Sequence, residues 1–175
     1  QNLCCMMQYD RDSVSVKKGY FCFQNGAVVL GTDLSGPGYG EVVTTVQQCR
    51  ASGEISREGG KVSHGGLFYE VLYGGEIQAG ITMRRGMWDD FSTLYTDVPA
   101  EGEVFEMGFV NDTSSFAYTV SPDRGFGYSI LSNTSGCQAV ASDGIMMAVF
   151  YSPGSIRNGD TVYAVSAPCI MISDG

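Results

Sequence analysis

The sequence predicts an all-β fold, an antiparallel β-sandwich of the Greek-key or jelly-roll type, as a single domain over residues 1–175. Three observations predict it. Short runs alternate apolar and polar residues, as half-buried strands do. Turn dipeptides recur between these runs, which is typical of sandwiches and barrels. The chain also has 24 glycines in 175 residues, which favours turns and penalises helices.

The alternating runs give the expected strands. In residues 104–109, Phe105, Met107 and Phe109 would share one face. Residues 161–165 have less distinct faces, so this strand is expected to be buried on both sides. The only stretch compatible with a helix is short, residues 88–95. The expected strands are 13–16, 20–23, 27–30, 41–46, 67–73, 76–83, 103–109, 115–120, 126–131, 145–151, 161–165 and 169–172.

Four dipeptides are expected to be turns. Asn25-Gly26 and Asn158-Gly159 supply the positive φ that a tight hairpin needs. Gly74-Gly75 and Asn111-Asp112 each lie between two expected strands and are interpreted as hairpin loops. Residues 31–40 and 51–66 are loop-like, and a domain boundary near 50–66 is the alternative to a single domain.

The six cysteines predict disulfide bonds and an oxidising compartment. A single histidine and the absence of a C-x-x-C pair disfavour zinc. If the local pairs Cys22–Cys49 and Cys137–Cys169 form, Cys4 and Cys5 have only each other, in a strained ring. The favoured alternative joins Cys4 and Cys5 to Cys22 and Cys49; bridges to another copy of the chain and six free thiols remain open. The predicted disulfide residues are Cys4, Cys5, Cys22, Cys49, Cys137 and Cys169.

The start at Gln1 is interpreted as the end left by removal of a signal peptide, so the protein is expected to be secreted. Residues 1–12 are expected to be an N-terminal tail that is docked by a disulfide or donated to a neighbouring chain. Asn111 and Asn133 begin N-x-S/T sequons in expected turns and are predicted glycosylation sites.

Composition excludes several partners. The formal net charge is −9, and the 10 basic residues do not cluster, which argues against nucleic acid and anionic membranes. No apolar stretch approaches the roughly 20 residues of a transmembrane helix. Neither G-x-G-x-x-G nor a Walker A run occurs, and no motif indicates calcium or another cofactor.

The sequence assigns no catalytic residue. His64 is the only histidine, no G-x-S-x-G elbow accompanies it, and a loop histidine without a catalytic role is the favoured interpretation. The carboxylate clusters at 10–12 and 89–90 are interpreted as solvated turns. A glycosidase pair depends on three-dimensional spacing, which the order of residues does not select.

The most suggestive positive signal is Trp88. This single tryptophan lies beside carboxylates and arginines, a combination that holds sugars by stacking and edge hydrogen bonds; a structural role at the edge of the core is the alternative. The speculative ligand-binding set is Arg85, Trp88, Asp89 and Asp90.

Residues 77–95, with Ile77-Gln78-Ala79-Gly80-Ile81 followed by Trp88 and Tyr95, are similar to a strand-turn segment of the actinoporin and fungal lectin sandwiches. Residues 115–122 are similar to another strand of that group. The resemblance implies a membrane-active toxin, although Cys4 and Cys5 stand where those toxins have an amphipathic helix.

Three non-enzymatic functions are therefore considered, and an enzyme ranks fourth behind them. The leading expectation is an extracellular structural protein that self-associates through strand edges and its N-terminal tail. The alternatives are a secreted, lectin-like glycan-binding module and the sandwich-type toxin.

Overall fold

All regular elements of the described residues are β-strands. The structure is a computed structural model that describes residues 2–37, 42–87 and 98–174. Every strand pairing in these ranges is antiparallel, which confirms the all-β antiparallel prediction. The region expected to be compatible with a helix, residues 88–95, lies outside the described residues.

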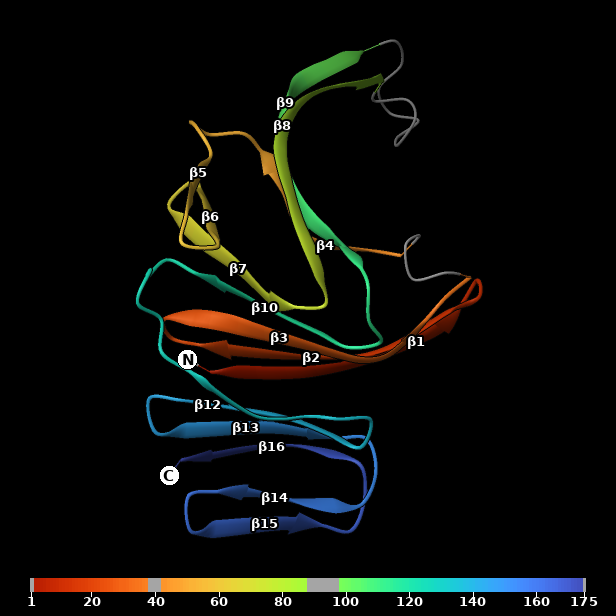
Figure 1. Cartoon of the computed structure of the whole chain (residues 1–175), viewed down its shortest axis with the longest axis vertical. Helices are drawn as coiled ribbons and strands as arrows, with labels where there is room; N and C mark the ends of the chain where they lie inside the picture. Colours follow the sequence, from red (N-terminus) through yellow and green to blue (C-terminus); the bar gives the residue numbers. More distant parts are fainter. Residues whose placement is uncertain (1, 38–41, 88–97, 175) are drawn as a thin grey trace.

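The strands form four sheets (Figure 1). The seven-stranded sheet has the order β1 (Leu3–Arg11), β2 (Val14–Phe23), β3 (Gly26–Ser35), β10 (Phe116–Ser121), β7 (Leu67–Tyr73), β6 (Lys61–His64), β5 (Ser56–Glu58). The three-stranded sheet has the order β4 (Val43–Arg50), β9 (Pro99–Asn111), β8 (Gly75–Met87). The four-stranded sheet has the order β11 (Ser129–Asn133), β12 (Cys137–Ser142), β13 (Ile145–Phe150), β16 (Cys169–Asp174), and β14 (Gly154–Asn158) pairs with β15 (Thr161–Val165).

The centre of the seven-stranded sheet is buried on both faces, so consecutive residues of β3 and β10 are buried. Val28 and Leu30 of β3 pack in a cluster that also contains Met147 of the four-stranded sheet. Val29, on the opposite face, packs in a cluster with Phe109 of the three-stranded sheet. Figure 1 accordingly shows the four-stranded sheet on one side of β1–β2–β3 and the three-stranded sheet on the other.

The strand expected to be buried on both faces, residues 161–165, is instead β15 of the β14–β15 hairpin. Its Val162 is 51% exposed. Only β14 pairs with it among the described strands. The indistinct faces of this run therefore belong to a peripheral strand and not to an interior one.

Two expected hairpin loops connect different sheets instead. Gly74-Gly75 leads from β7 in the seven-stranded sheet to β8 in the three-stranded sheet, and Asn111-Asp112 leads back from β9 to β10. The two crossings are adjacent, because the Asp112 amide donates to the Gly74 carbonyl at 3.1 Å. Gly74 has a φ of 108°, and a Cβ there would lie 2.3 Å from Cβ of Phe116, so this corner requires glycine.

Asn111 holds this crossing from a fully buried position. Its Nδ2 donates to the Val42 carbonyl at 2.9 Å and to Thr44 Oγ1 at 2.9 Å, while Thr44 Oγ1 donates to Asn111 Oδ1 at 3.1 Å. The residue was expected in an exposed turn, as a glycan acceptor requires. The structure uses its amide in packing, and a glycan there would have to displace these hydrogen bonds.

Asn133 also has a bonded amide. Its Nδ2 donates to the carbonyl oxygens of Gly31 and Phe116 at 3.1 and 3.2 Å and to Tyr73 Oη at 2.7 Å. The buried Gln138 donates to Asn133 Oδ1 at 3.0 Å. These bonds join β11 and β12 to the seven-stranded sheet, so Asn133 ties the two parts of the molecule together.

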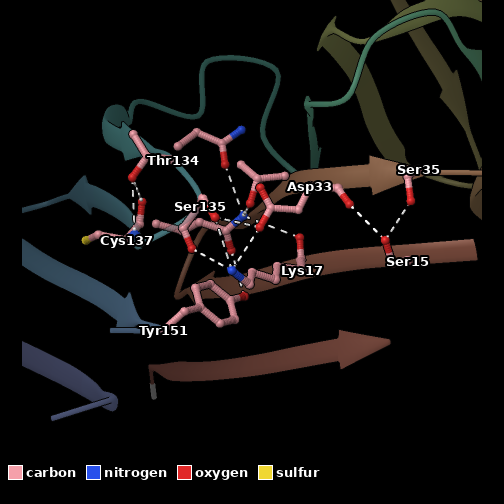
Figure 2. A network of polar contacts seen from close by, with 11 residues as sticks. Ser15, Lys17, Asp33, Ser35, Thr134, Ser135, Cys137 and Tyr151 are labelled. Carbon is pink, nitrogen blue, oxygen red and sulfur yellow. Dashed lines mark hydrogen bonds and ion pairs between the residues drawn. The ribbon is translucent and has the colours of Figure 1, made fainter. Parts of the chain in front are cut away.

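A second polar contact joins the same two parts (Figure 2). Lys17 Nζ of β2 lies 2.8 Å from Asp33 Oδ2, donates to the Ser135 carbonyl at 2.9 Å and lies 5.2 Å from the ring centre of Tyr151. Ser135 Oγ donates to Asp33 Oδ2 at 2.6 Å. Lys17, Asp33 and Ser135, called the latch below, fasten the β11–β12 loop to β2 and β3.

The expected disulfide framework is wrong, because every cysteine is a free thiol. Cys137 and Cys169 both pair with Phe150 of the intervening β13, about two strand spacings or 10 Å apart, whereas a disulfide needs Cα atoms within roughly 7 Å. Cys22 and Cys49 lie in different sheets. The free thiols are Cys4, Cys5, Cys22, Cys49, Cys137 and Cys169.

Most of the expected N-terminal tail forms an edge strand of the seven-stranded sheet. Residues 3–11 are β1, which pairs with β2 from Leu3 opposite Cys22 to Arg11 opposite Val14. Cys4 is buried in the core against the four-stranded sheet, whereas Cys5 is exposed. No helix in the described ranges is long and apolar enough to cross a bilayer.

Candidate functional site

The outer face of the three-stranded sheet carries a groove of about 330 Å³. The groove forms because successive side chains of a strand point to opposite faces of the sheet. In β9, Phe105, Met107 and Phe109 are buried toward the seven-stranded sheet, so Glu106 and Gly108 face outward. The polar side chains along the groove are Thr45, Gln48, Gln78, Thr82 and Glu106.

Two glycines form part of its floor. Gly80 of β8 pairs with Glu106, and Gly108 of β9 pairs with Gln78. A Cβ at Gly108 would lie 2.8 Å from the Thr44 carbonyl oxygen, so glycine is needed for β4 and β9 to approach. A Cβ at Gly80 would meet nothing within 4 Å, so this position is open. Glycine inside a strand commonly marks such a close approach.

A polar chain crosses the groove from strand to strand. Gln48 Nε2 of β4 donates to Glu106 Oε1 of β9 at 2.7 Å. Arg84 Nη2 of β8 lies 2.6 and 2.8 Å from the two carboxylate oxygens of Glu106. These contacts hold the pKa of Glu106 below its usual value, chiefly through the Arg84 hydrogen bond and then through that of Gln48.

The lowered pKa limits what Glu106 can do. An efficient general base has a pKa near the operating pH, and a carboxylate that is held in its charged form by a guanidinium is a weak proton acceptor. The groove therefore offers amide, hydroxyl and guanidinium groups for binding, with a carboxylate that orients one of them.

His64 is equally unsuited to acid–base chemistry at a surface. It is buried, stacks on Phe105 at 4.2 Å between ring centres, and accepts the Ser52 backbone N–H at Nε2, 3.0 Å away. The favoured interpretation from the sequence was a histidine without a catalytic role. It was expected in a loop, but it ends strand β6 and stacks on Phe105, a member of the cluster between the seven- and three-stranded sheets.

Of the speculative ligand-binding residues, Trp88, Asp89 and Asp90 lie outside the described residues. Arg85 is described: its side chain is 78% exposed and its Nε lies 3.1 Å from Glu101 Oε2. Arg85 belongs to β8, one of the three strands of the groove, but its side chain lies on the opposite face of the sheet from that of Arg84. Within residues 2–37, 42–87 and 98–174, no group of three His, Cys, Asp or Glu side chains is placed to hold a metal ion.

The sequence analysis missed the groove residues, although two signals were present. Glu106 lies between Val104 and Gly108 on the face opposite the apolar one of an alternating run, and Gly80 and Gly108 lie inside expected strands. Gln48 and Arg84 could not be joined to Glu106 without the strand register, which brings β4 and β8 to opposite sides of β9.

Comparison with protein families gives two matches that together span most of the chain. Residues 4–126 match the polysaccharide lyase family 8 super-sandwich domain. Residues 129–174 match the polysaccharide lyase family 8 C-terminal β-sandwich domain. The groove lies in the first match, and the latch and Asn133 join the two.

Similar proteins agree with these matches. Chondroitinase-AC of Pedobacter heparinus is 22% identical in an alignment 195 residues long, which covers 93% of this chain and 28% of that protein. A chondroitinase AC lyase structure from a study of oligosaccharide complexes has a TM-score of 0.84 at 20% identity, over 97% of this chain and 30% of that one. The Streptomyces coelicolor A3 chondroitin AC lyase, in complex with chondroitin sulphate, has a TM-score of 0.73 at 19% identity, over 87% of this chain and 24% of that one.

These matches overturn the expected function. Both family matches are to domains of enzymes, so the expectation of a non-enzymatic, self-assembling structural protein is wrong, as are the lectin-like and toxin alternatives. The chain spans less than a third of each similar protein's length. With the first family match alone extending from residue 4 to residue 126, this chain belongs to polysaccharide lyase family 8.

Proposed function

We propose that this chain is the β-sandwich part of a polysaccharide lyase that acts on an acidic polysaccharide of the chondroitin type. In this proposal, the groove of β4, β8 and β9 holds a stretch of the polysaccharide. The chemical step is assigned to residues beyond this groove. The observation that carries the proposal is a polar groove whose Glu106 is ion-paired with Arg84, on the outer face of a lyase family domain.

The groups in the groove suit a sugar chain. Gln48 and Gln78 each have an amide that donates and accepts hydrogen bonds, and Thr45 and Thr82 have hydroxyls that do both, so they match sugar hydroxyls. Such a site fixes orientation with a few placed polar groups. The open glycine at position 80 lets a ring approach the backbone of β8.

The chemical step is assigned to residues outside the groove because of the base that the reaction needs. A lyase removes a proton from the carbon beside a carboxyl group, the glycosidic oxygen departs with the bonding electrons, and a carbon–carbon double bond forms. This step needs a base whose pKa is near the working pH. Glu106 has a lowered pKa and His64 is buried, so neither supplies that base in this fold.

Binding of chondroitin sulfate to the 175-residue chain tests the proposal. Titration calorimetry should detect binding of the acidic polysaccharide and none of dextran, an uncharged polysaccharide. The double variant Gln48→Ala/Gln78→Ala should bind about thirtyfold more weakly, because each of the two lost hydrogen bonds contributes about 1 kcal/mol.

Gln8→Ala is the matched control, since Gln8 is an exposed amide on β1, at the far edge of a different sheet. It should leave the affinity unchanged. Absence of binding by the unmodified chain, or an equal loss in the control and in the groove variant, would remove the groove from the proposed function.

A further inference from the structure

Arg84 is the basic residue of the three-stranded sheet that a network of hydrogen bonds holds beside the groove. Its side chain is 59% exposed, yet Nη2 contacts both carboxylate oxygens of Glu106. Glu106 is in turn held by Gln48. The chain Gln48–Glu106–Arg84 therefore runs across all three strands of the sheet, from β4 through β9 to β8.

This network reduces the freedom that Arg84 would lose on binding a ligand. An arginine side chain has many rotamers, and ordering one costs roughly 0.5–1.5 kcal/mol when a ligand must do it. A guanidinium has five N–H donors on three nitrogens, and Glu106 engages Nη2, so the group can bind a second anion beside the first.

The sheet has open positions on the face that carries Arg84. Arg84 pairs with Gly102 of β9, and a Cβ at Gly102 would meet nothing within 4 Å. Gly80, two pairs further along the outward face, is open in the same way. Arg50 of β4 and Thr82 of β8 both pair with Val104 and so share this face, which brings a second guanidinium to the end of the groove.

We infer that Arg84 determines specificity for the anionic group of the polysaccharide, a carboxylate or a sulfate ester, and that Glu106 and Gln48 are positioning residues. This inference rests on the proposed function of the groove. A planar guanidinium binds either oxyanion through paired N–H donors. The Arg84 side chain is 59% exposed, so such a group can reach it from solvent without displacing Glu106.

Arg85 is a matched control for this inference. It is the next residue, carries the same charge and is also ion-paired, to Glu101. It alternates to the opposite face of β8, away from the groove. Arg84→Gln and Arg85→Gln therefore change the net charge equally and differ in which face loses a guanidinium.

The experiment measures affinity of the unmodified chain and both variants for three polymers: chondroitin sulfate, desulfated chondroitin, and carboxyl-reduced chondroitin sulfate. Arg84→Gln should weaken binding of chondroitin sulfate about tenfold, the loss expected for one charge-assisted hydrogen-bonded contact, and Arg85→Gln should change it less than twofold. If Arg84 binds the sulfate, the tenfold effect disappears with desulfated chondroitin; if it binds the carboxylate, the effect disappears with the carboxyl-reduced polymer.

Two other outcomes separate this inference from the proposed function. If the unmodified chain binds chondroitin sulfate but the two variants lose affinity equally, Arg84 contributes only general charge; the inference is overturned and the groove proposal stands. If the unmodified chain does not bind at all, both fall. Unchanged thermal melting of Arg84→Gln checks that the variant is folded.

Discussion

His64 combines two roles in the cluster between the seven- and three-stranded sheets. Its ring stacks on Phe105, and its Nε2 accepts the Ser52 N–H, so the neutral ring carries its proton on Nδ1. We expect His64→Ala to lower the free energy of unfolding by about 2–4 kcal/mol, because it leaves a cavity and an unpaired backbone donor. Urea denaturation measures this loss.

His64→Phe separates the two roles. Phenylalanine retains a ring against Phe105 and removes the buried, unpartnered Nδ1–H, but cannot accept the Ser52 N–H, so the expected loss is below about 2 kcal/mol and smaller than that of His64→Ala. If both variants lose the same stability, ring packing contributes nothing and this account of His64 is wrong.

Buried acids make stability depend on alkaline pH. Burial, with smaller effects of Cys5 and Cys22, raises the pKa of Cys4 from 9.0 to about 12. Burial also raises the pKa of Tyr118 and Tyr151 above that of a free phenol. The folded state thus keeps these protons where the unfolded chain has released them, so the free energy of unfolding falls as pH rises.

The expected decline begins near pH 9, where an unfolded cysteine ionises, and continues through the raised pKa of about 12. Denaturant unfolding at a series of alkaline pH values measures it. Cys4→Ala should reduce the slope over this range because alanine does not titrate. A stability that is flat from pH 9 to about 12 would show that Cys4 ionises as readily when folded as when unfolded.

At the scale of strands, the latch depends on a β-bulge. The pairing of β2 with β3 shifts register between Ser15 and Lys17, and Asp33 takes a φ of 55°. Bulges re-aim side chains at the cost of a regular ladder. Here the bulge turns the Asp33 carboxylate toward Lys17 and Ser135, and so toward the four-stranded sheet (Figure 2).

Asp33→Asn tests the latch because asparagine tolerates a positive φ but removes the charge. The expected loss of stability is about 0.5–1 kcal/mol at neutral pH, since the ion pair is partly exposed. The Lys17 and Ser135 hydrogen bonds lower the pKa of Asp33, so its contribution is present above the ordinary carboxyl pKa and is lost as pH falls through the lowered value.

The difference between Asp33→Asn and the unmodified chain should therefore disappear in acid. Asp160→Asn, at an exposed position in the β14–β15 hairpin, is the control and should cost nothing at either pH. A loss at Asp33 that persists unchanged in acid would mean that the carboxylate charge is not what fastens the loop.

Local patterns predicted most strands but not their partners. Residues 67–73 and 161–165 have the boundaries of β7 and β15, because alternation and turn residues are local signals. β1, β5, β6, β12 and β14 were missed; β1 lies in the expected N-terminal tail, and β5 and β6 lie in a region interpreted as a loop. Gly74-Gly75 predicts a turn whether the chain forms a hairpin or crosses to another sheet. Which sheet the next strand joins depends on tertiary packing, which the local sequence does not show.

The candidate site shows the same limit. Glu106 lay in an expected strand, but its contacts come from Gln48 and Arg84, 58 and 22 residues away. Only the register of three strands brings them together. The expectation of disulfides failed for a related reason: counting cysteines does not reveal that a strand separates Cys137 from Cys169.

At the scale of the whole molecule, the two family matches share one hydrophobic core. Phe21, Val28 and Leu30 of the first match are fully buried against Met147 and Val149 of the second. We therefore expect that the sequence boundary near residue 127 does not separate two folding units. We expect the chain to unfold in a single cooperative transition.

Met147→Ala tests this directly, because it removes a buried side chain of β13 from that shared core. The expected cost is about 2–5 kcal/mol, and hydrogen exchange should show protection falling together at β13 and at β3 across the interface. Ile156→Ala is the control: Ile156 packs only in the cluster between the four-stranded sheet and the β14–β15 hairpin. If Met147→Ala instead lowers the hydrogen-exchange protection of β13 while β3 keeps its full protection, the two matched regions are independent folding units. The three-stranded sheet that carries the groove would then not depend on the C-terminal sandwich.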